Sequence, residues 1–153
     1  MNVPILQHKY GSPIASTPAN ASMSYRSQTS SYREMELLSA SPERLVVIVF
    51  EQLVVNLERA RIAMERNDVE LRVTALRRAR GLLSELLATL DFEKGGSLAN
   101  QLADLYQFML YELIDIGQRG DLHVMRKLVS IASNLRDGFV GAAQQTLALQ
   151  KSA

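Results

Sequence analysis

The sequence predicts an all-α protein, an antiparallel up-and-down four-helix bundle that follows a flexible N-terminal tail. Apolar residues recur every three or four positions in four long segments after residue 40, and no segment alternates as a β-strand does. Residues that cap or break helices separate these segments. Because the separating turns are short, sequential helices should be antiparallel neighbours. Three of the four prolines lie before residue 20, where apolar periodicity is almost absent.

The composition limits the classes of function that the chain can have. Its 153 residues suffice for one domain with one sizeable core. A net charge of +1 creates no overall field for nucleic acid or an anionic membrane, and without cysteine there is no thiolate chemistry. The N-terminus lacks the apolar core of a signal peptide, and no apolar run approaches the roughly 20 residues of a membrane helix. We therefore expect a cytoplasmic (cytosolic) protein without membrane insertion or nucleic-acid binding.

The first 31 residues are predicted to form the flexible tail. They are rich in Ser, Pro, Ala, Asn, Gln and Thr, so they cannot bury enough apolar surface to offset the entropy of ordering. Residues 32–149 are predicted to form the helical-bundle domain. A short helix over residues 32–38 is a candidate first element, because it would dock Leu37 on the bundle.

The first long helix is predicted over residues 42–66. Ser41 is placed to cap it, Pro42 suits the first helical position, and Glu43 adds negative charge to the first turn. Six apolar residues, 45–50, follow without a break, which indicates a central helix that has several neighbours or borders a binding groove. The expected inner face is Leu45, Val49, Leu53, Leu57, Ala60 and Met64, with Val46, Val47, Ile48, Val54, Val55 and Ile62 off that face.

Three further helices are predicted over residues 69–90, 98–116 and 122–149. An aspartate is placed to cap the first and the last of these, while the glycine-containing segment 91–97 is predicted to be a turn in which Ser97 caps the next helix. The expected inner residues are Val69, Val73, Leu76, Ala79, Leu83, Leu86 and Leu90, then Leu98, Leu102, Leu105, Met109, Leu113 and Ile116, and finally Met125, Leu128, Ala132, Leu135, Phe139 and Ala142.

The sequence contains no pattern that predicts a catalytic or metal-binding site. Helical bundles hold paired metal ions through inward glutamates and Glu-x-x-His pairs, but neither His8 nor His123 has a glutamate three residues earlier. Glu112 and Asp115 lie on one helix face without a histidine, so a solvated face is the better interpretation. The glycine patterns of nucleotide binding are also missing. We expect no cofactor, and a helical-bundle enzyme or metal carrier remains only as a rival hypothesis.

Three motifs in a fixed order connect the chain to a known family. The first comprises Tyr32, Leu37, Ser39-Ala40-Ser41-Pro42, Leu45 and Phe50. The second comprises Leu90-Asp91-Phe92-Glu93-Lys94-Gly95-Gly96, Leu98-Ala99-Asn100-Gln101-Leu102 and Leu105-Tyr106-Gln107-Phe108-Met109. The third, weaker motif is Leu135-Arg136-Asp137 with Phe139, where the family commonly has tryptophan. From about residue 24 to 145 the chain resembles the flagellar secretion chaperones of flagellin, the FliS family.

The resemblance implies a cytoplasmic type III export chaperone without enzymatic activity. Such a protein binds the disordered C-terminal segment of flagellin, prevents its premature polymerisation and assists its delivery to the export apparatus. The export gate protein and an anti-sigma factor are further candidate partners. The alternative is a helical-bundle adaptor, or a chaperone for a different exported protein. The oligomeric state stays open between a monomer and a weak homodimer.

Nine apolar residues form the predicted partner-binding surface, because amphipathic segments bind in apolar grooves between helices. They are Tyr32, Leu37, Ile48, Val55, Ile62, Leu105, Tyr106, Phe108 and Met109. For each of them the competing interpretation is ordinary core packing, which is favoured for Leu105 and Met109. A further hypothesis is that the segment with Tyr32 and Leu37 covers the groove when no partner is bound.

Overall fold

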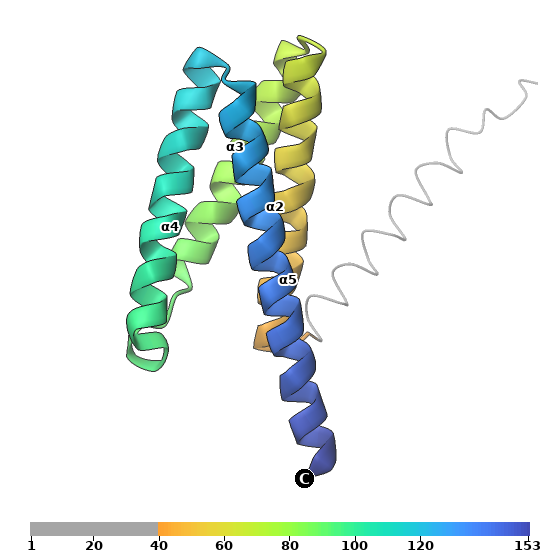
Figure 1. Cartoon of the computed structure of the whole chain (residues 1–153), viewed down its shortest axis with the longest axis vertical. Helices are drawn as coiled ribbons and strands as arrows, with labels where there is room; N and C mark the ends of the chain where they lie inside the picture. The colour runs from red at the N-terminus through yellow and green to blue at the C-terminus, as the bar shows by residue number, and fades with distance from the viewer. Residues whose placement is uncertain (1–39) are drawn as a thin grey trace, which may run out of the picture. The chain divides into compact units, whose positions relative to one another are not determined.

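The computed structural model describes residues 40–153, so the predicted tail and the segment with Tyr32 and Leu37 lie outside the described residues. The described part contains four helices and no strand, and the helices run alternately up and down (Figure 1). They are α2 (Pro42–Glu65), α3 (Val69–Ala88), α4 (Phe92–Arg119) and α5 (Leu122–Ser152). The predicted all-α four-helix bundle is therefore confirmed.

Three of the four side chains that were predicted to cap helices do so. Ser41 Oγ and Asp68 Oδ1 each accept a hydrogen bond from the backbone N–H three residues later, at 3.2 Å in α2 and 3.0 Å in α3. Asp121 Oδ1 accepts hydrogen bonds from the backbone N–H groups of His123 and Val124 in α5, at 2.9 and 3.2 Å. These oxygens satisfy backbone donors that have no partner inside the helix. The caps therefore fix where each of these three helices begins.

Helix α4 begins at Phe92, earlier than the predicted Leu98. Asp91 is its cap, because Asp91 Oδ1 accepts hydrogen bonds at 3.1 and 3.0 Å from the N–H groups of residues 93 and 94. Gly96 then interrupts the helix with φ 52° and ψ −129°, a conformation that residues with a Cβ avoid. The prediction of a plain turn closed by Ser97 was wrong, since the segment is a capped helical turn followed by a kink.

The core lies along α2, which packs against both α3 and α5, whereas α4 packs mainly against α3 and much less against α5. The prediction of a central helix is confirmed. Leu45, Val49 and Met64, which were expected on its inner face, are only partly buried. Because two neighbours cover α2, its buried arc is wider and includes Val47, Phe50, Leu53, Val54, Leu57, Ala60 and Ala63.

Some residues that were predicted to face the core are exposed. Val69 and Leu98 are each 59% exposed, Val73 is 45% exposed, and Ala142 is also exposed. These positions lie in the first turns of α3 and α4 or near the end of α5, where no neighbouring helix covers the apolar stripe. Small residues that the apolar pattern did not select are buried between the helices instead: Ala63, Ala75, Ala99 and Ala103.

Candidate partner-binding groove

An apolar groove opens at the end of the bundle where α2 begins and where α3 passes into α4, both at the bottom of Figure 1. Its first compartment has a volume of about 300 Å³ and lies mainly between α3 and α4. Its second compartment, of about 310 Å³, lies between the start of α2 and the later part of α5. Val46 and Phe139 line both compartments, so the two adjoin each other.

The walls of the two compartments differ in the size of their side chains. Large apolar residues line the first compartment beside the shared pair: Leu86, Leu90, Leu98, Leu102 and Tyr106. Small residues predominate in the second compartment: Pro42, Ala142, Ala143 and Thr146. The kink at Gly96 places Gly95 and Leu98 on the wall of the first compartment, one on each side of the break in α4.

The aromatic rings of Tyr106 and Phe139 line the groove, and the buried ring of Phe50 supports both of them from the core. The rings of Phe50 and Phe139 are stacked, with centroids 4.9 Å apart and an interplanar angle of 21°. Phe50 also contacts Tyr106 at 6.3 Å and 53°. Offset and tilted pairs of this kind are favourable arrangements of aromatic rings. Burial raises the pKa of Tyr106 to about 12. The rings join α2, α4 and α5 beneath the groove, so its floor is well packed.

Charged side chains lie only at the rim of the groove. Asp91 and Lys94 border the first compartment, and Glu43 borders the second. The carboxylate of Asp91 is occupied by the cap of α4. Within residues 40–153, neither Lys94 nor Glu43 forms an ion pair. Lys94 and Glu43 are therefore available to pair with charges of a bound partner, while Asp91 adds a second carboxylate at the rim whose Oδ1 is held by the cap.

The structure separates the predicted site residues on α4 into core and surface. Tyr106 is 2% exposed and lines the groove, while Met109 is fully buried within the core. Leu105 is partly buried and Phe108 is 48% exposed. Of the predicted partner-binding residues that the structure describes, Tyr106 is the one that lines the groove.

The predicted residues on α2 form a stripe that is separate from the groove. Ile48, Val55 and Ile62 are spaced by seven residues and so share one helix face. None of the three is buried, and Val55 is 41% exposed. We call these residues the α2 stripe. Its side chains lie opposite the buried arc of α2, so it is a second apolar surface rather than part of the groove.

Most residues that line the first compartment were not among the predicted site residues: Val46, Leu86, Leu90, Leu98, Leu102 and Phe139. Five of them were predicted to lie on core faces and Val46 on the flank of α2, because periodicity cannot distinguish a covered stripe from one that is open at a helix end. The signal that could have located them is the glycine pair, Gly95 and Gly96, which ends the first segment of the second motif. Because the helix changes direction at this pair, Leu90 before it and Leu98 after it need not be covered by the same neighbouring helix.

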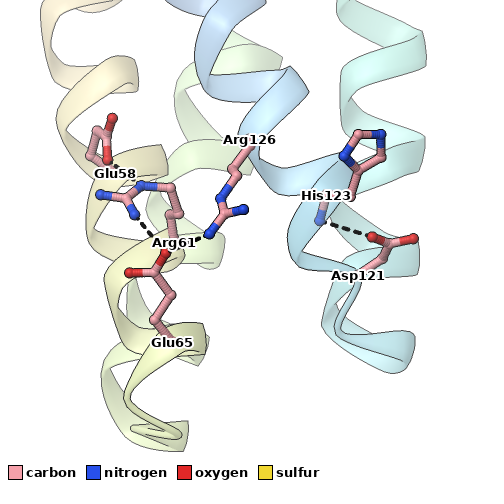
Figure 2. Close-up of polar contacts among 6 residues, drawn as sticks. All are labelled: Glu58, Arg61, Glu65, Asp121, His123 and Arg126. Atoms are coloured by element: carbon pink, nitrogen blue, oxygen red, sulfur yellow. Dashed lines mark hydrogen bonds and ion pairs between the residues drawn. The ribbon is translucent and has the colours of Figure 1, made fainter.

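A cluster of ion pairs joins α2 to α5 at the opposite end of α2 (Figure 2). Arg61 Nε lies 2.7 Å from Glu58 Oε2, and Arg61 Nη1 lies 2.9 Å from Glu65 Oε1. Arg126 Nη2 of α5 lies 3.1 Å from the same Glu65 oxygen. The hydrogen bond from Arg126 and the nearby Arg61 hold the pKa of Glu65 below its ordinary value. Because the cluster is solvent-exposed, its contribution to stability is modest and salt-dependent.

Residues 40–153 contain neither a cluster of metal-ligating side chains nor a helix that could span a membrane. No group of three or more His, Asp or Glu side chains is placed to hold a metal ion. No helix there is long and apolar enough to cross a membrane. His123, drawn in Figure 2, contacts Asp121 through its backbone N–H, as part of the cap of α5.

The family model described as flagellar protein FliS matches residues 24–146. The chain belongs to the FliS family. The flagellar secretion chaperone FliS of Salmonella typhimurium is 33% identical over 107 residues, which are 69% of this chain and 79% of that protein. The flagellar secretion chaperone FliSB of Pseudomonas aeruginosa is 28% identical over 108 residues, which are 71% and 86% of the two chains.

A crystal structure of a flagellar chaperone from bacteria has the same fold. It superposes with a TM-score of 0.64 at 13% identity and covers 77% of this chain and 98% of that chain. Membership of the FliS family confirms the resemblance drawn from the three motifs and assigns the chain a chaperone role in flagellar export. FliS proteins are chaperones and do not form a known enzyme family.

Proposed function

We propose that the chain binds the C-terminal segment of flagellin in the cytoplasm, prevents its premature polymerisation and assists its delivery to the export apparatus. The apolar groove is the observation that carries this proposal. Two adjoining compartments of about 300 Å³ each have room for anchor side chains of an amphipathic segment. Such segments bind through anchors at positions i, i+3, i+4 and i+7. No step of this function requires catalysis.

The packing of the groove suits a partner that is disordered before it binds. Phe50 and Tyr106 keep the floor in place, so the chaperone itself has little to rearrange. Ordering of the segment on binding costs about 2–5 kcal/mol of the gross contact free energy. This cost keeps the complex reversible, and capture and release can follow mass action without ATP.

The predicted surface outside the groove is retained in the proposal as a second contact region. It comprises the α2 stripe and Phe108 of α4, which expose apolar side chains on the solvent faces of their helices. Tyr32 and Leu37 remain proposed contacts as well. A substitution in a true core position such as Leu53 should unfold the bundle, because Leu→Ala in a core costs about 2–5 kcal/mol. A substitution in the α2 stripe should weaken binding while the melting temperature changes little.

The proposal is tested by calorimetric titration with a peptide of the C-terminal segment of flagellin from the same organism. We expect one-to-one binding, a negative heat-capacity change and a gain of helix in the circular dichroism spectrum. Leu98→Ala should weaken binding by about tenfold or more, because the exposed leucine lines the groove. Val69→Ala is the matched control, since Val69 is equally exposed but does not line the groove.

The same titration separates flagellin from another client. If the folded protein shows no heat with the peptide at several temperatures, the groove serves a different exported protein or an adaptor role. Equal affinities of Leu98→Ala and wild type would remove the groove from the proposal. Docking of the export gate protein or an anti-sigma factor, and a state between monomer and weak homodimer, stay predictions that pull-down and sedimentation experiments check.

A further inference from the structure

We infer that Lys94 and Glu43 set the direction in which a bound segment lies in the groove. The inference rests on the proposed function and deepens it, because it defines the chemistry of the segment. The segment carries a carboxylate near one end of its apolar stretch and a cationic side chain near the other. The carboxylate pairs with Lys94 and the cation pairs with Glu43.

The arrangement of the two compartments supports this inference. Lys94 lines only the first compartment and Glu43 only the second, while Val46 and Phe139 lie between them and line both. The two charges therefore stand on opposite sides of the shared apolar pair. Both side chains are exposed and have no ion-pair partner within residues 40–153. A partner can reach each of them without displacing another charged residue.

Neighbouring charges reduce this polarity without reversing it. Asp91 shares the rim with Lys94 and keeps its negative charge, but its Oδ1 is held by two backbone hydrogen bonds at the start of α4, the positive end of the helix dipole, which partly offsets that charge. On α5, Arg136 and Asp137 precede Phe139 and pair with each other at 3.0 Å. They therefore add no net charge beside the groove.

Charge is needed here because apolar contacts alone do not define a direction. An amphipathic helix presents a similar row of apolar side chains when its chain direction is reversed, and apolar compartments tolerate exchange of similar anchors. Opposite charges at the two ends make one direction attractive and the other repulsive. Charge complementarity commonly contributes orientation and specificity in this way, more than raw affinity.

The test uses full-length protein and the flagellin peptide in double-mutant cycles. Glu43→Lys and Lys94→Glu are each titrated, at low and at high salt, against wild-type peptide and against peptides in which each charged residue is neutralised in turn. We expect each protein variant to lose about three- to tenfold in affinity at low salt and less at high salt. Glu43→Lys should couple to one basic residue of the peptide, and Lys94→Glu to one acidic residue at the other end.

Two controls match the tested residues. Glu70→Lys reverses a glutamate that also lies in the first turn of its helix, and Lys127→Glu reverses an exposed lysine of α5. Neither residue lines the groove, so both variants should bind the peptide within about 1.5-fold of wild type. A thermal scan of every variant confirms that the bundle is folded.

The possible outcomes distinguish the inference from the function on which it rests. If the peptide binds wild type but the groove variants behave like the controls, the charges do not orient the segment and the inference fails. The inference also fails if affinity falls without coupling to any charged residue of the peptide, because the charges then act on something else, such as residues 1–39 of the chain itself or a second copy. If the peptide does not bind wild type, it is the proposed function that fails.

Discussion

The ring of Phe139 on α5 stacks on the ring of Phe50 on α2, with centroids 4.9 Å apart. Phe139 also lines both compartments of the groove. One side chain therefore belongs to the core and to the candidate binding surface at once. Phe50 is fully buried, whereas Phe139 is partly exposed. Changes at Phe139 should affect stability and binding together, in contrast to changes at the outer wall of the groove.

Phe139→Ala should lower the free energy of unfolding by about 1–3 kcal/mol, less than for a fully buried phenylalanine because Phe139 keeps some exposure. The same variant should bind the flagellin peptide at least tenfold more weakly. Chemical denaturation and calorimetry measure the two effects. Phe108→Ala is the control for stability, since Phe108 is 48% exposed and forms no aromatic ring pair within residues 40–153. Equal stability losses in both variants would contradict the prediction.

Gly96→Ala should destabilise the bundle by about 1–3 kcal/mol, because φ 52° and ψ −129° are strained for any residue with a Cβ. Gly81→Ala makes the same chemical change in the middle of α3, where the added Cβ meets nothing within 4 Å. It should stabilise the protein by about 0.5–1 kcal/mol, since alanine is the better helix former. Opposite shifts in the denaturation midpoint are the expected result. A stabilising effect at position 96 would mean that the kink is absent.

The Glu65 ion pairs should make stability depend on acid pH. The folded-state pKa of Glu65 is lowered, chiefly by the hydrogen bond from Arg126, so its contribution is present above the unfolded pKa near 4.5 and is lost as the pH falls through the folded value. Melting temperatures of wild type and Glu65→Gln should therefore differ at pH 7 and converge toward pH 3. The difference should also shrink in high salt. Glu70→Gln, which removes a glutamate without an ion pair among residues 40–153, should show no such convergence.

Tyr106 should make stability depend on alkaline pH. Burial raises its pKa from 10 to about 12, so the folded state favours the neutral phenol. That contribution is fully present below pH 10 and is lost as the pH rises from 10 to about 12. Tyr106→Phe should therefore lose less stability than wild type across this window in denaturant titrations. Tyr111→Phe is the control, because Tyr111 is 68% exposed and should follow wild type.

Helix caps were the part of the fold that could be predicted best from the sequence. Ser41, Asp68 and Asp121 cap their helices as expected, because a cap depends on a few adjacent residues. Asp91 was missed as a cap because the glycine pair after it was interpreted as the end of a helix rather than as a kink inside one. Whether a helix continues through a kink depends on tertiary packing that local sequence does not contain.

The candidate site was less predictable, because exposure depends on which neighbours a helix has. Leu98 continues the apolar stripe of α4 but is 59% exposed, and Met109 is on the same stripe and fully buried. Tyr106 was selected for its aromatic ring and does line the groove. Phe139 was assigned to the core, and only the arrangement of α2 and α5 shows that it also borders open space.

The ion pairs of Glu65 and the groove beside Pro42 lie at opposite ends of α2, a helix of 24 residues whose length is about 36 Å. Helices α2 and α5 are thus joined by exposed ion pairs at one end, and at the other they border the second compartment beyond the stacked rings of Phe50 and Phe139. Backbone amides of α5 after Phe139, where the side chains are exposed or half-buried, should therefore exchange with solvent by local fluctuation. Amides near the buried Met125 and Leu128 should exchange only when the whole bundle unfolds. A segment entering the groove would then meet a rigid aromatic base and an outer wall that fluctuates.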